Sequence, residues 1–175
     1  MAPVDVILDY DQTIKAVDAM FTRHRLEKVS LVGHSYGSII ASWLIQQRPQ
    51  YLAHAHLVDP VCFMMWKHNL LYSFLFEEPN CIFHEFMRFA LSKDPNISKA
   101  ISKELYIYET ILFPEDITVP TTVFLADDEF LIDGVATKEY LEKRLPSHSK
   151  LVMMDTFHGG VVFQSDCFLE LVSHI

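Results

Sequence analysis

A serine between two glycines is the feature of this sequence whose residue types could do chemistry most directly. Ser35 lies in the run Gly33-His34-Ser35-Tyr36-Gly37. A β-branched stretch ends just before this run and apolar residues at helical spacing begin just after it, which predicts a strand, a sharp turn and a helix. Such a turn holds a hydroxyl out from the edge of a sheet, where it could act as a nucleophile. The alternative is an ordinary turn that carries an incidental serine.

The two glycines have a predicted structural purpose. The turn is expected to force the backbone of Ser35 into a strained conformation, and Gly33 and Gly37 would let strand and helix approach without a Cβ clash. Glycine is scarce in this chain, with 5 in 175 residues. A chance serine between two glycines at this spacing is therefore rare, on the order of one chain in a hundred.

His158 is the predicted partner of this serine, because a serine hydroxyl at neutral pH is a weak nucleophile until a base takes its proton. It follows a strand predicted over 150–154, and Gly159 and Gly160 beside it would let the loop turn the imidazole toward the serine. Four of the five glycines in the chain flank Ser35 or His158. A solvated loop histidine is the alternative interpretation.

The run around Ser35 resembles the nucleophile elbow of the α/β-hydrolase fold superfamily, in its serine esterase and lipase-like members. The order of the elements that follow resembles the second half of that fold, from about Asp11 to the C-terminus. The resemblance implies an α/β fold with a mostly parallel sheet and a triad in the chain order serine, acid, histidine. His34 is then expected to pack beside the nucleophile.

The same resemblance implies that the triad acid follows a strand predicted over 119–126. When the family pattern is laid on the sequence without gaps, the acid position is Glu129. Asp128 stays open as the alternative, because aspartate is the commoner triad acid. Asp127 and Asp133 are then expected to be solvated or capping residues, with Asp133 the N-cap of a helix over 135–145.

The beginning of the sequence departs from the family pattern. An oxyanion hole takes one backbone N–H from the residue after the nucleophile, here Tyr36, and a second from an early loop that often carries His-Gly. No such loop precedes Asp11, so we expect a fold that is truncated at its N-terminus. The strand over 29–32 would then be an exposed apolar edge that could pair with another copy.

Apolar spacing and turn residues predict the other elements. We expect a helix with Asp11 as its N-cap, a helix after the serine that runs to about Gln47, and a last helix that runs through Val162 and Leu171. A strand over 52–61 places His54 and His56 on one face. Since no carboxylate or cysteine nearby completes a ligand set, solvated or edge histidines are favoured over a metal pair.

Aromatic and methionine side chains crowd the segment 62–117. The resemblance implies that this segment is a helical cap or lid inserted into a core formed by 1–61 and 118–175. Ordinary core packing explains most such side chains. If a pocket lies beneath the cap, its composition favours an apolar ligand, such as an acyl chain.

Composition excludes several functional classes. The chain is half apolar and carries a net charge of −9, so it is expected to fold as one domain and to bind neither nucleic acid nor anionic membranes. Cys62, Cys81 and Cys167 are widely spaced and indicate neither disulfides nor a metal site. No secretory signal or span-length apolar stretch is present, so we expect a cytoplasmic protein.

These observations together predict a serine hydrolase that cleaves a carboxylic ester with an apolar acyl or alcohol part. No metal or organic cofactor is implied. A serine at the elbow argues against the dehalogenase and epoxide-hydrolase branches of the superfamily, which carry an aspartate there. Two alternatives follow from the missing oxyanion loop: a non-catalytic binding protein on the same fold, or an inactive fragment.

Overall fold

The computed structural model describes residues 9–67, 69–76, 78, 85, 89 and 107–174. Half of the predicted cap, 62–117, lies outside these residues, so the cap stays a prediction. Within the described ranges, no helix has both the length and the apolar character that crossing a membrane requires.

Over the part of the chain that the structure describes, four parallel strands form the centre of the fold, in the order β1-β2-β3-β4. Their bounds are β1 Val29–His34, β2 Leu52–Val58, β3 Thr121–Asp128 and β4 Lys150–Phe157. The predicted α/β class with a parallel sheet is confirmed for the described part of the chain. Three strands, β1, β3 and β4, end two or three residues later than predicted, because backbone pairing continues past the last apolar residue of each pattern.

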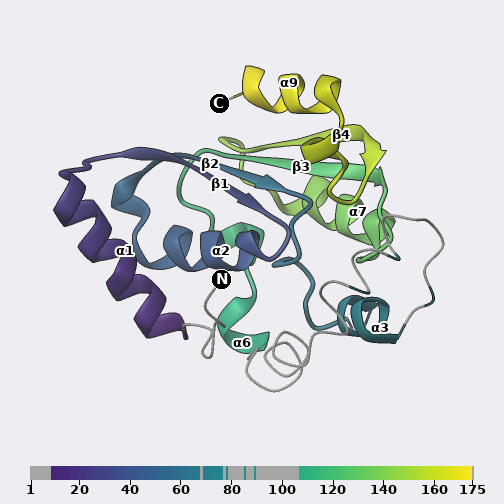
Figure 1. Cartoon of the computed structure of the whole chain (residues 1–175), viewed down its shortest axis with the longest axis horizontal. Helices are drawn as coiled ribbons and strands as arrows, with labels where there is room; N and C mark the ends of the chain where they lie inside the picture. Colours follow the sequence, from purple (N-terminus) through teal and green to yellow (C-terminus); the bar gives the residue numbers. More distant parts are fainter. Residues whose placement is uncertain are drawn as a thin grey trace.

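Helices cover both faces of this sheet (Figure 1). On one face lie α1 (Tyr10–His24), α2 (Gly37–Gln47) and α7 (Gly134–Arg144), whose apolar side chains form the larger core. On the other lie α8 (Gly160–Phe163) and α9 (Ser165–Ser173), and Leu171 of α9 packs with Phe124 and Met154 in a smaller core. The short helices α3 (Asn69–Phe76) and α6 (Ile107–Thr110) belong to the segment between β2 and β3.

Side chains at the helix ends correct two of the sequence predictions. The N-cap of α1 is Asp9, not Asp11, because Asp9 forms a reciprocal capping box with Gln12 that Asp11 cannot form from within the first turn. The prediction of a single last helix is wrong as well. Gln164 adopts an extended conformation that separates α8 from α9. Asp133 does cap α7, and its Oδ1 accepts the Ala136 N–H at 3.0 Å.

Within the described residues, β1 pairs with β2 alone and is therefore an edge strand. Its Val32 side chain is 45% exposed, on the face opposite α2. A row of backbone groups beside an exposed apolar side chain is what a further strand would pair with. The arrangement is the one expected from the sequence, and self-association through it stays a prediction.

Two stacked histidines on β2 differ from the expectation of solvated side chains. The rings of His54 and His56 stack with centroids 4.4 Å apart, and His56 is fully buried. His54 Nε2 lies 3.0 Å from Thr122 Oγ1, whereas neither ring nitrogen of His56 has a hydrogen-bond partner among the described residues. The prediction is wrong for His56, because α9 and its neighbours cover this face of the sheet.

The burial of His56 predicts loss of stability in mild acid. Burial, reinforced by the charges of His54, His174 and Lys150, lowers the pKa of His56 from 6.5 to about 4. The unfolded chain therefore takes up a proton that the folded chain resists, so stability present above pH 6.5 is lost as the pH falls toward 4. We expect a loss on the order of 2 kcal/mol, measured by urea unfolding at both pH values.

A His56→Gln variant isolates this contribution, because glutamine does not titrate. Its free energy of unfolding is expected to fall less between pH 6.5 and 4 than that of the wild type. His24 is exposed on α1, so His24→Gln is the matched control and should keep the wild-type slope. Equal slopes in all three proteins would contradict the assignment.

Candidate active site

A tight turn connects β1 to α2 and carries Ser35 at its apex. Ser35 has a φ of 51°, in the left-handed region that non-glycine residues seldom adopt. The turn is held by the Ser35 N–H, which donates to the Val58 oxygen at 2.9 Å, and by the Ser38 hydroxyl, which donates to the Ser35 oxygen at 2.6 Å. The strained serine expected from the sequence is therefore present, and its surroundings hold it in place.

The two glycines that flank this serine are not equivalent. A Cβ on Gly33 would lie 2.8 Å from the Gly37 backbone oxygen and 2.9 Å from the Ala41 Cβ, so strand and helix meet there with no room for a side chain. A Cβ on Gly37 would have no atom within 4 Å. The predicted clash is thus correct for Gly33 and wrong for Gly37, which lies on the open side of the turn.

This difference gives a matched pair of variants. Gly33→Ala is expected to lower the free energy of unfolding by about 1–3 kcal/mol, because the backbone of α2 has to move away from β1. Gly37→Ala is expected to be neutral, or to stabilise by up to about 1 kcal/mol through the better helix propensity of alanine. Urea denaturation of both variants measures the effect, and equal stabilities would contradict it.

His158 lies between Ser35 and a carboxylate. Its Nε2 is 2.9 Å from Ser35 Oγ, and its Nδ1 is 2.7 Å and 2.9 Å from the two carboxylate oxygens of Glu129. Both the imidazole and the Glu129 side chain are only 1% exposed. A neutral imidazole with its proton on Nδ1 donates to Glu129 and leaves Nε2 free to accept the hydroxyl proton.

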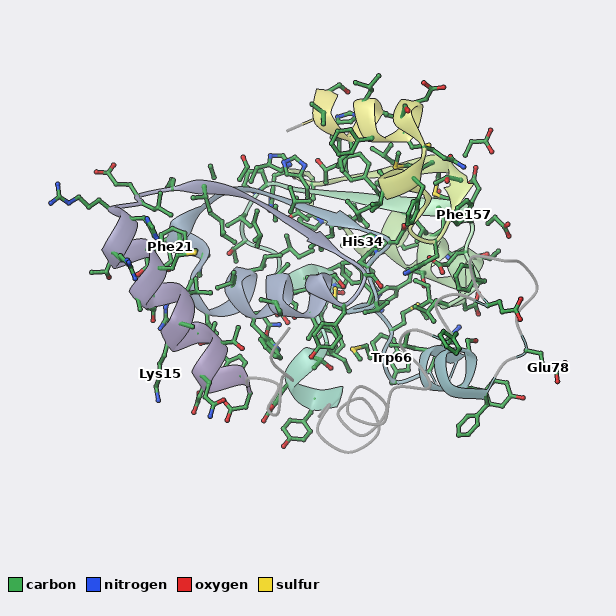
Figure 2. All side chains as sticks on the ribbon, viewed as in Figure 1. Lys15, Phe21, His34, Trp66, Glu78 and Phe157 are labelled. Atoms are coloured by element: carbon green, nitrogen blue, oxygen red, sulfur yellow. The ribbon has the colours of Figure 1, made fainter. Side chains whose placement is uncertain are left out.

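Parallel pairing of the strands brings these three residues together. They follow the carboxyl ends of β1, β3 and β4, which meet at one edge of the sheet. Figure 2 labels His34 and Phe157, which directly precede Ser35 and His158, at this edge. Ser35 and His158 are 123 residues apart in the sequence, so only the topology places them in contact.

The two acid candidates occupy different environments. Asp128 is the last residue of β3 and its side chain is exposed, whereas the Glu129 carboxylate points inward to His158. Glu129 Oε1 also accepts the Leu131 N–H at 2.8 Å, which fixes the carboxylate from the other side. Asp127 is exposed, and Asp133 caps α7.

Charges around His158 raise its pKa. Burial alone would lower the pKa of the imidazole, but the hydrogen bond and negative charge of Glu129, with a further contribution from Asp59, outweigh burial. The imidazolium form is therefore stabilised relative to a histidine in water. An imidazole with these neighbours therefore holds a proton more readily than an imidazole in water.

Tyr36 and His34 are the remaining elbow residues named from the sequence. Tyr36 immediately precedes α2, where backbone N–H groups have no partner within the helix and can face a developing negative charge. The His34 ring lies 5.8 Å from that of His158, centroid to centroid. In the described ranges, no group of three or more His, Cys, Asp and Glu side chains is arranged to hold a metal ion.

Asp59 is a buried carboxylate at this edge that was not among the site residues predicted from the sequence. It follows β2 directly, is 2% exposed and accepts the Gly159 N–H at 2.8 Å. The strand predicted over 52–61 includes Asp59 and Pro60, but β2 ends at Val58. The Asp-Pro pair was the signal that could have identified this end, because proline lacks the N–H that strand pairing needs and the carboxyl ends of parallel strands share an edge.

Comparison with known proteins identifies the fold. No family model matches the sequence, and no curated protein matches it. The solved structures that match in fold include three hydrolases. They are 2-hydroxy-6-oxo-6-phenylhexa-2,4-dienoate hydrolase from Rhodococcus sp. strain RHA1, MGS-MChE2, an alpha/beta hydrolase enzyme from a lagoon-sediment metagenome of Mar Chica, Morocco, and naproxen esterase from Bacillus subtilis.

These matches span nearly the whole chain at low sequence identity. The Rhodococcus enzyme is 18% identical with a TM-score of 0.67 over 94% of this chain and 69% of its own. MGS-MChE2 is 13% identical with a TM-score of 0.68 over 99% and 72%, and the esterase is 14% identical with a TM-score of 0.66 over 98% and 68%. The chain therefore has the α/β-hydrolase fold.

Proposed function

We propose that this chain is a serine hydrolase that cleaves carboxylic esters through Ser35, His158 and Glu129. The observation that carries the proposal is the distance of 2.9 Å between Ser35 Oγ and His158 Nε2, with Glu129 on the opposite ring nitrogen. A hydroxyl, an imidazole and a carboxylate in this order form the arrangement that activates a serine for acyl transfer.

The proposed reaction has two halves. His158 Nε2 takes the hydroxyl proton while Ser35 Oγ attacks the ester carbonyl, and the same nitrogen then gives the proton to the departing alcohol. A water molecule activated by His158 cleaves the acyl-serine and releases the acid. Glu129 keeps the proton on Nδ1 throughout and stabilises the imidazolium that forms between these steps.

The Tyr36 N–H is the oxyanion donor that we assign to the elbow. It lies at the N-terminal end of α2, where the helix dipole also favours negative charge. Loss of one donor costs on the order of a hundredfold to a thousandfold in turnover. The rate of ester hydrolysis by this chain therefore depends strongly on whether a second backbone N–H reaches the carbonyl oxygen of the substrate.

The proposed substrate is an ester with an apolar acyl or alcohol part. Naproxen esterase, one of the structural neighbours, is an esterase by name. Phe130 lies against the catalytic edge, with its ring 5.6 Å from that of His158. We propose that 62–117 contributes a cap over this edge, on a core formed by 1–61 and 118–175.

An active-site fluorophosphonate probe tests the proposal. We expect covalent labelling of the wild-type chain, no labelling of Ser35→Ala, and hydrolysis of p-nitrophenyl esters that depends on acyl length. Circular dichroism of both proteins checks that they are folded. A folded, monodisperse wild type that takes no label would overturn the proposal and favour a non-catalytic binding protein on this fold.

A further inference from the structure

The Asp59 carboxylate connects two segments of the candidate site. Its Oδ1 accepts the Ala126 N–H at 3.1 Å, and its Oδ2 accepts the Gly159 N–H at 2.8 Å. Ala126 lies on β3, three residues before Glu129, and Gly159 directly follows His158. One buried side chain therefore fixes the distance between the segment that carries the acid and the loop that carries the base.

The backbone of Asp59 is itself held in an unfavourable conformation. Its φ is 44°, in the left-handed region, and its N–H donates to the Phe124 oxygen at 2.9 Å. Such a conformation is unfavourable for a non-glycine residue and persists only where the surroundings impose it. Here the imposed conformation directs the carboxylate toward the His158 loop.

Asp59 also brings negative charge to this edge. Burial alone would raise the pKa of its carboxyl, but His34, whose Nε2 lies 3.7 Å from Oδ2, together with the charge of His158 and the Gly159 N–H, lowers it. Asp59 is therefore ionised at neutral pH. Among the described residues, the titratable and charged groups that face His158 are Glu129 from the loop after β3, His34 from the elbow and Asp59 from the end of β2.

We propose that Asp59 is a positioning residue for the proposed hydrolysis: it anchors the His158 loop to β3 and supplies a second buried negative charge that favours the imidazolium. The effects on kcat and kcat/KM that follow from this inference rest on the proposed function. Asp59 acts through Gly159 and through its charge, and it does not touch the reacting atoms.

The variant Asp59→Asn tests both parts. The amide keeps the shape but lacks the charge and can accept only one of the two backbone N–H groups. We expect kcat to fall about tenfold to a hundredfold. We also expect the acid limb of the pH profile of kcat/KM to move to lower pH, because the pKa of His158 loses one of the charges that raise it. Asp127→Asn removes an exposed carboxylate near the end of β3 and should leave both unchanged.

Two measurements decide the inference without turnover. In the first, imidazole NMR follows the titration of His158, and its pKa is expected to be lower in Asp59→Asn than in the wild type. An unchanged pKa would overturn the electrostatic part.

In the second measurement, hydrogen exchange of the wild type is expected to show a protected Gly159 amide. Exchange as fast as that of an unbonded loop amide would overturn the anchor, even if Asp59→Asn does not fold. If both measurements give the expected results but the fluorophosphonate probe does not label the chain, the proposed function is wrong and the anchoring role of Asp59 stands.

Discussion

Replacement of His158 by glutamine is expected to lower kcat for ester hydrolysis by about ten-thousandfold to a millionfold. Glutamine fills similar space but cannot take up the hydroxyl proton, so Ser35 would remain a neutral alcohol during attack. Removal of the base in a serine hydrolase costs nearly as much as removal of the whole triad, because the three residues act as one unit. Steady-state kinetics with a p-nitrophenyl ester measures the loss.

Two controls separate loss of chemistry from loss of structure. The double variant Ser35→Ala with His158→Gln is expected to be no slower than either single variant, since each already removes the shared function. His24→Gln, at an exposed position on α1, should keep full activity. If His158→Gln retained more than about a tenth of the wild-type kcat while folded, His158 would not be the base.

Glu129→Gln is the second variant with a large expected effect, a fall in kcat of about a thousandfold to ten-thousandfold. The amide can present its NH₂ group to Nδ1, which would move the imidazole proton to Nε2, where it blocks transfer from Ser35. The loss of negative charge also removes the main support for the imidazolium. Kinetics at several pH values measures both effects.

Asp128→Asn provides the comparison that distinguishes the two acid candidates. Its carboxylate is exposed at the end of β3, so its removal is expected to change kcat by less than about threefold. A larger loss in Asp128→Asn than in Glu129→Gln would reverse the assignment and would mean that the loop after β3 rearranges when substrate binds.

Local patterns in the sequence were sufficient to predict most of the architecture. The β-branched run before Gly33 and the apolar spacing after it predicted β1, the turn and α2, because strands and helices differ in the period of their buried side chains. Asp133 predicted the start of α7, because a short acidic side chain accepts hydrogen bonds from the free N–H groups at the start of a helix. The parallel sheet was implied by the resemblance to the α/β-hydrolase fold. Connections between parallel strands are short and right-handed, so few topologies then remained possible.

Only the tertiary structure decided which side chains meet. Asp128 and Glu129 are neighbours, yet adjacent residues in an extended chain point in opposite directions, so one is solvated and the other lies against His158. The sequence could not show that Gly37 has open space around it, that His56 is buried, or that Asp59 reaches Gly159, 100 residues away.

The sequence by itself thus determined the elements and the chemical types available at their ends, because these depend on residues within a few positions of one another. The tertiary structure decided the partners of each group. Hydrogen bonds between side chains that are far apart in the sequence depend on how strands align and how closely helices approach, and distances of a few tenths of an ångström decide whether such bonds form.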